Sequence, residues 1–119
     1  MFEVAIYARI LVKTGPKHVM GPGLKTLLEH IQDSGSIAEA ARRMGISYRK
    51  ALRMIERLNE ACGQEMIQTW KGGPNKGGAS LSPQGEQLLL RYKTLTQRVA
   101  DFLAKEAADF WTPQGFKAP

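Results

Sequence analysis

The most informative segment of the chain for its fold is Ser36–Cys62, SIAEAARRMGISYRKALRMIERLNEAC. It predicts two helices joined by a tight turn. Ser36 caps the first helix, with Glu39 three residues on to complete a capping box. Gly45 ends that helix, since glycine suits a left-handed helix terminus, and Ser47 is a good N-cap for the second. The apolar residues of the first helix fall at helical spacing: Ile37, Ala40, Ala41 and Met44.

The second helix has an apolar face and a basic face. Its apolar face carries Ala51, Leu52, Ile55, Leu58 and Cys62. Its other face carries Arg49, Lys50, Arg53 and Arg57. A helix, a glycine turn and a basic second helix are typical of the helix-turn-helix, whose second helix enters the DNA major groove. An ordinary helical hairpin with a solvated charged face is the alternative interpretation.

The charge of the chain supports a polyanionic partner. The 119 residues carry a net charge of +6 with a pI near 9.7, and residues 36–62 hold half of that surplus. The single cysteine, Cys62, excludes an internal disulfide, and we interpret it as a core residue of a protein in a reducing compartment. The start of the chain lacks signal-peptide order and no apolar run reaches membrane length. We therefore expect a soluble cytoplasmic protein associated with the nucleoid and not with a membrane.

Two elements are expected before the helix-turn-helix. Residues 2–13 alternate apolar and polar side chains, which predicts one strand with a buried face. A turn at Thr14–Lys17 follows, and then a helix over Pro22–Asp33. The apolar stripe of this helix is Leu24, Leu27, Leu28 and Ile31.

A β-hairpin is expected directly after the basic helix. Its strands are Glu65–Trp70 and Ala79–Leu81, and the glycine-rich loop between them carries Lys71, Asn75 and Lys76. A hairpin in this place is the wing of a winged helix. The two lysines suit contact with phosphates or with the minor groove.

A long helix is expected to close the chain. Ser82 is its N-cap and Pro83 its first residue, and the helix can reach Trp111. At about 1.5 Å per residue it is longer than a small winged helix can cover, which favours pairing with a second copy of itself. The residues expected at this dimer interface are Leu88, Tyr92, Leu95, Val99, Phe102 and Leu103. Folding back onto its own domain is the alternative.

Catalytic and metal chemistry find no support in the sequence. His18 and His30 lie far from Cys62, without zinc-ligand spacing. Gly21–Thr26 resembles a phosphate-binding loop, but Leu24 stands where the glycine before lysine belongs. No acid, base and nucleophile set can be assembled, so we expect no enzyme and no cofactor.

Three segments together resemble one family. They are Ser34–Ala41, Met44–Arg49 and the glycine-rich wing that continues into Leu81–Glu86. They are similar to the N-terminal DNA-binding domain of the molybdate-responsive regulators of ModE type, and more loosely to LysR-type regulators. The resemblance implies a winged helix, a dimer made by the N-terminal strand and the last helix, and a palindromic operator. Those regulators bind molybdate in domains after this one; here the chain stops at Pro119, so metal-oxyanion sensing is not carried over.

The resemblance also implies which residues meet DNA. It places recognition-helix contacts on Ser47, Tyr48, Arg49, Lys50 and Arg53, and wing contacts on Lys71, Asn75 and Lys76. Arg53 departs from the aromatic residue common near this position, so a different base sequence is expected. We expect Arg42, Arg43 and Arg57, together with the wing, mostly to hold phosphates, and we expect Ser36 to be a further DNA-binding residue.

The prediction is a mainly α protein with a small β component. Residues 1–81 form a winged helix-turn-helix domain with an N-terminal strand, residues 82–111 a long dimerisation helix, and residues 112–119 a loose tail. Its expected function is sequence-specific binding of double-stranded DNA by a homodimeric transcriptional regulator. The alternative is a protein-interaction or architectural module whose DNA binding is nonspecific. An effector or partner protein stays open.

Overall fold

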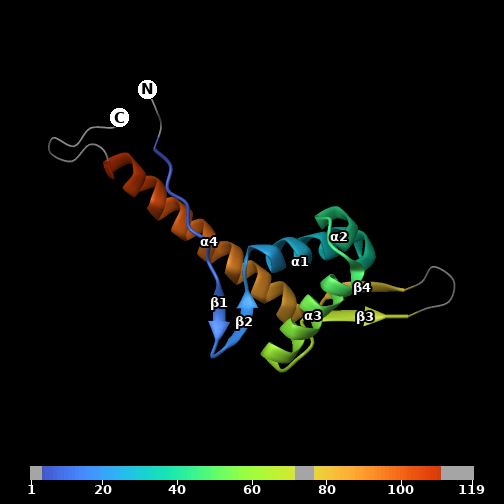
Figure 1. Cartoon of the computed structure of the whole chain (residues 1–119). Coiled ribbons are helices and arrows are strands. Elements are labelled where there is room, and N and C mark those ends of the chain that lie inside the picture. The colour runs from blue at the N-terminus through green and yellow to red at the C-terminus, as the bar shows by residue number, and fades with distance from the viewer. Residues whose placement is uncertain (1–3, 72–76, 111–119) are drawn as a thin grey trace.

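The computed structural model describes residues 4–71 and 77–110. The predicted fold class is confirmed: four helices and two small antiparallel hairpins form a winged helix-turn-helix with a long last helix (Figure 1). The elements in chain order are β1 (Val12–Thr14), β2 (Lys17–Met20), α1 (Pro22–Ser34), α2 (Ile37–Met44), α3 (Tyr48–Cys62), β3 (Ile67–Trp70), β4 (Gly78–Leu81) and α4 (Pro83–Phe110). The expected tail, residues 112–119, lies outside the described residues.

The helix-turn-helix forms through the local signals that the sequence carries. The Ser36 hydroxyl accepts a hydrogen bond from the Glu39 backbone N–H at 3.1 Å, and the Ser47 hydroxyl accepts one from Lys50 N–H at 3.0 Å. Gly45 ends α2 in the left-handed conformation at φ 69°. The capping box is only half formed, because the Glu39 carboxylate binds arginines and the Ser36 N–H donates to Ser34 Oγ instead.

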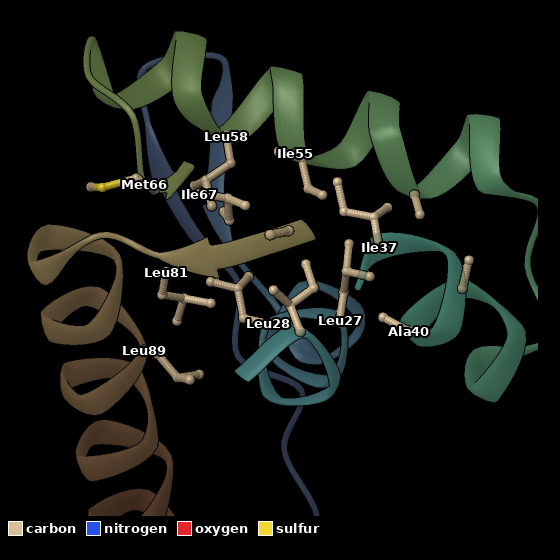
Figure 2. Packing of buried hydrophobic residues seen from close by; sticks show 14 of the residues in the cluster. Leu27, Leu28, Ile37, Ala40, Ile55, Leu58, Met66, Ile67, Leu81 and Leu89 are labelled. Atoms are coloured by element: carbon tan, nitrogen blue, oxygen red, sulfur yellow. The ribbon is translucent and has the colours of Figure 1, made fainter. Parts of the chain in front are cut away.

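One apolar core joins the helices to both hairpins. Figure 2 shows Leu27 and Leu28 of α1 pointing toward Ile55 and Leu58 of α3, with strand β4 alongside. Leu89 brings the start of α4 into the same cluster. The other fully buried large apolar side chains are Met20, Ile31 and Ile67. This core fixes α3 so that the opposite face of the helix stays in solvent.

The N-terminal strand is much shorter than the alternation predicts. Residues 4–11 form no strand, and β1 covers only Val12–Thr14. It pairs with β2 through a turn at Gly15 (φ 59°). The strand β2 was not predicted from the sequence. Alternation shows which side of an extended segment is apolar, but a strand also needs a hydrogen-bonded neighbour. Residues 4–11 instead run beside α4 (Figure 1), where the Tyr92 hydroxyl donates to Ile10 O at 2.7 Å.

The wing and α4 are connected through Met66. Strands β3 and β4 pair from Ile67 with Leu81 to Trp70 with Gly78. The backbone N–H and the hydroxyl of Ser82 both donate to Met66 O, at 2.9 and 3.2 Å, while Ser82 Oγ accepts from Gly85 N–H as the cap of α4. After these hydrogen bonds at its start, α4 continues far past the helix-turn-helix (Figure 1). Of its residues after Tyr92, all of them described, Ala107 is the one that is buried.

Candidate nucleic-acid interface

The outer face of α3 presents four cations to solvent. Arg49, Arg53 and Arg57 follow each other at four-residue spacing, Lys50 lies beside them, and all four are exposed. None of them forms an ion pair within residues 4–71 and 77–110. An incoming phosphate or base edge therefore displaces no carboxylate from these groups. Tyr48, at the first position of α3, is 54% exposed.

The two arginines of α2 are in a different electrostatic situation. Arg42 donates from Nε to Glu39 Oε1 at 2.8 Å, and Arg43 donates from Nε to Glu39 Oε2 at 3.1 Å and from a terminal nitrogen to Asp33 Oδ2 at 2.6 Å. The hydrogen bonds from Arg42 and then Arg43 lower the pKa of Glu39 to about 2. Both arginines are exposed, but their charge is already largely balanced. They are weaker candidates for phosphate contact than the cations of α3.

Three predicted DNA contacts come together at a groove of about 610 Å³ between the start of α2, the first turn of α3 and the base of the wing. They are Ser36, Tyr48 and Lys71. The Ser36 hydroxyl is occupied as the α2 cap, whereas the Lys71 side chain is exposed. Ser47 is likewise occupied in capping α3. Asn75 and Lys76, the other expected wing contacts, lie outside the described residues.

Arg57 lies apart from this groove. Together with His18 it lines two clefts between α3 and the β1–β2 hairpin, each below 300 Å³. Arg9 lines one of them, and Lys17 and Glu60 line the other. If Arg57 contacts a phosphate, that contact lies on the β1–β2 side of α3 and not on the side of the wing.

Sequence reasoning missed Trp70. This residue is 49% exposed at the end of β3 and lines the groove beside Tyr48 and Lys71. Its place as the last residue of the first wing strand was visible in the sequence. Its accessibility was not, because tryptophan is highly buried on average and residue type alone gives no sign that this one is half exposed.

The stripe expected at the dimer interface divides into three pairs of residues. Tyr92 is 4% exposed within the single chain, and Leu88 packs partly against the core. Val99 and Leu103 line a groove of about 300 Å³ between α4 and residues 6–10. Leu95 and Phe102 are 41% and 60% exposed, so the apolar surface left open on this side of α4 centres on them.

Two other features are absent from the part of the chain that the structure describes. Those residues contain no group of three His, Cys, Asp or Glu side chains that could hold a metal ion. No described helix combines the length and apolar character that crossing a bilayer requires. Burial raises the pKa of the Cys62 thiol, which fits a packing role.

The fold and the basic, unpaired face of α3 define the class: a winged helix-turn-helix domain of the kind that binds DNA. The chain belongs to the bacterial regulatory helix-turn-helix family of lysR type, whose profile matches residues 26–86. It is similar to the molybdenum-pterin-binding protein MopB of Rhodobacter capsulatus (35% identity over 95 residues, 80% of this chain and 34% of MopB). It is also similar to the transcriptional dual regulator ModE of Escherichia coli (34% over 88 residues, 74% of this chain and 34% of ModE).

A third relative, the transcriptional regulator ModE of Haemophilus influenzae, is 36% identical over 69 residues, 58% of this chain. These similarities confirm the resemblance to the ModE-type regulators. The chain spans about a third of the length of the first two relatives.

Proposed function

We propose that this chain is a transcriptional regulator that binds a specific double-stranded DNA sequence as a homodimer. The unpaired basic face of α3 is the observation that carries the proposal. Arg49, Lys50 and Arg53 occupy its first two turns, the part of a recognition helix that meets base edges. Arginine in the major groove pairs with the O6 and N7 acceptors of guanine.

The proposed dimer forms through α4. Leu95 and Phe102 expose large apolar side chains on one side of a helix that extends past the domain (Figure 1). Packing two copies antiparallel would cover both stripes and relate two recognition helices by a two-fold axis. Half-sites would then lie ~34 Å or a multiple apart on an imperfect inverted repeat.

The test of DNA binding starts by selecting bound sequences from a random duplex pool. Affinity for the selected site should fall steeply as salt rises, because phosphate contacts release counterions. Arg53→Ala should lose about 1–3 kcal/mol on that site and relax its sequence preference. Lys71→Ala should weaken all sequences alike and lower the salt slope by about one.

The matched control for these variants is Lys105→Ala, which removes one exposed positive charge from the far part of α4. It should change neither preference nor salt slope. Selection that yields no preferred sequence contradicts specific regulation and supports the interaction or architectural module. Binding that is absent at low salt contradicts the proposal altogether.

The test of the dimer replaces Leu95 and Phe102 together with Glu. A dimer of this variant would bury four carboxylates in its interface. Because each buried unpaired charge costs several kcal/mol, the variant should be monomeric. Leu90→Glu is the control, since Leu90 is 57% exposed and lies on a different side of the same helix from Leu95 and Phe102. Light scattering at tens of micromolar decides. A monomeric wild type would contradict both the dimer and the inverted repeat.

A further inference from the structure

We infer that the groove between α2, α3 and the wing holds the sugar–phosphate backbone of one DNA strand, with the Trp70 indole packed against deoxyribose. The inference rests on the proposed function, because it places a second contact beside the recognition helix. It assigns to Trp70 a part in DNA binding that the basic residues do not supply.

The groove is the largest of the clefts described above. Its volume of about 610 Å³ is roughly twice that of each of the others, which lie between about 280 and 300 Å³. Three separate elements frame it: Ile37 and Ala38 at the start of α2, Tyr48 and Leu52 in α3, and Trp70 and Gly78 in the wing strands. Its α3 side is lined by Tyr48 and Leu52, and the residue that follows each of them, Arg49 and Arg53, is an exposed cation of the basic face.

The indole of Trp70 is held in place by the opposite strand. Trp70 pairs with Gly78, and a Cβ on Gly78 would lie 2.6 Å from Cζ2 and 2.9 Å from Cε2 of the indole. The ring therefore lies on the bare glycine backbone and fills the space that a side chain would take. Half of Trp70 is still exposed, and it lines the groove. A tryptophan so positioned offers a rigid apolar contact surface with little entropy left to lose on binding.

The lining of the groove matches a DNA backbone in charge and in polarity. Among the described residues that line it there is one cation, Lys71, and no carboxylate. The first turn of α2 opens into it, and backbone N–H groups at a helix start favour negative charge. Trp70, Tyr48 and Leu52 add apolar surface. A DNA strand alternates anionic phosphate with apolar deoxyribose, so it matches both the positive charge and the apolar surface of the groove. An acidic peptide has no apolar group repeated between its charges in this regular way.

The chain allows a direct optical test. It has two tryptophans, Trp70 and Trp111, so the full-length Trp111→Phe variant leaves Trp70 as the only indole. The selected duplex is titrated while two signals are followed: the anisotropy of labelled DNA, which reports binding, and Trp70 emission with acrylamide quenching, which reports the groove. We expect both to saturate at the same DNA concentration, with Trp70 becoming protected from acrylamide.

The two signals separate the two hypotheses. Anisotropy that saturates while Trp70 emission and quenching stay constant would overturn the inference and leave the proposed function standing. Anisotropy that does not change at all would remove the proposed function, and this inference with it.

Substitution gives an independent measurement. Trp70→Ala should weaken binding to every duplex roughly three- to tenfold, the size expected for one aromatic contact, while the salt slope stays unchanged because no charge is lost. Trp70→Phe keeps an aromatic face and should lose less. Far-UV circular dichroism confirms that each variant is folded. Wild-type affinity in a folded Trp70→Ala protein would overturn the inference.

Discussion

Gly85→Ala is expected to destabilise the protein, although alanine is the better helix former. Gly85 lies in the first turn of α4, and a Cβ there would lie 2.0 Å from Met66 O and 3.0 Å from Met66 C. These are backbone atoms that cannot swing aside. The same carbonyl accepts both hydrogen bonds from Ser82, so moving it also disturbs the start of α4.

The magnitude follows from three contributions. Overpacking costs about 1–3 kcal/mol, a disturbed hydrogen bond adds about 0.5–1.5 kcal/mol, and helix propensity returns about 1 kcal/mol. The net loss in free energy of unfolding is about 0.5–3.5 kcal/mol, centred on about 2 kcal/mol, and the central value lowers Tm by about 8 °C at about 4 °C per kcal/mol for a domain of this size. Thermal unfolding followed by far-UV circular dichroism at one fixed protein concentration measures it.

The matched control is Gly23→Ala in α1. A Cβ at Gly23 meets no atom within 4 Å, so alanine there should be neutral or raise stability by about 0.4–1 kcal/mol. The two substitutions have the same chemistry and differ in the space around the new methyl group. Equal stabilities of Gly85→Ala and Gly23→Ala would contradict this prediction, because they would mean that α4 does not pack tightly against Met66, the residue before β3.

Three further predictions concern single side chains. Tyr92→Phe removes the hydrogen bond to Ile10 O, so stability should fall by about 0.5–1.5 kcal/mol and limited proteolysis should cut the N-terminal segment faster; equal rates would contradict this. Asn59→Ala leaves the backbone N–H groups of Met66 and Ile67 without the side-chain oxygen that accepts their hydrogen bonds, so the free energy of unfolding in urea should fall by about 1–3 kcal/mol. Gln64→Ala, at an exposed position nearby, should leave that free energy unchanged. Because the folded pKa of Glu39 is lowered to about 2 from 4.5, its contribution is present above pH 4.5 and is lost as pH falls toward 2. The Tm gap between wild type and Glu39→Gln should therefore close over that range, and a gap independent of pH would contradict the assignment.

Elements whose signals are local could be predicted from the amino-acid sequence alone. Ser36, Ser47 and Gly45 act within four residues of their own positions, so the ends of α2 and the start of α3 could be predicted from residue type. Helical spacing gave the buried face of α3 and, by exclusion, its basic face. The wing followed from two short apolar strands around a glycine-rich loop.

Contacts between residues that are distant in the sequence could not be predicted, because they depend on how the elements pack. Residues 4–11 alternate like a strand, yet only Val12–Thr14 finds a hydrogen-bonded partner. Arg43 looks as free as Arg53 in the sequence, but the packing of α1 against α2 brings Asp33 to within 2.6 Å of it. Trp70 lies open on Gly78 because the strand register pairs them. Helix caps and hydrophobic periodicity depend on residues that are close in the sequence. Contacts between distant residues depend on how whole elements pack, and no short segment specifies that packing.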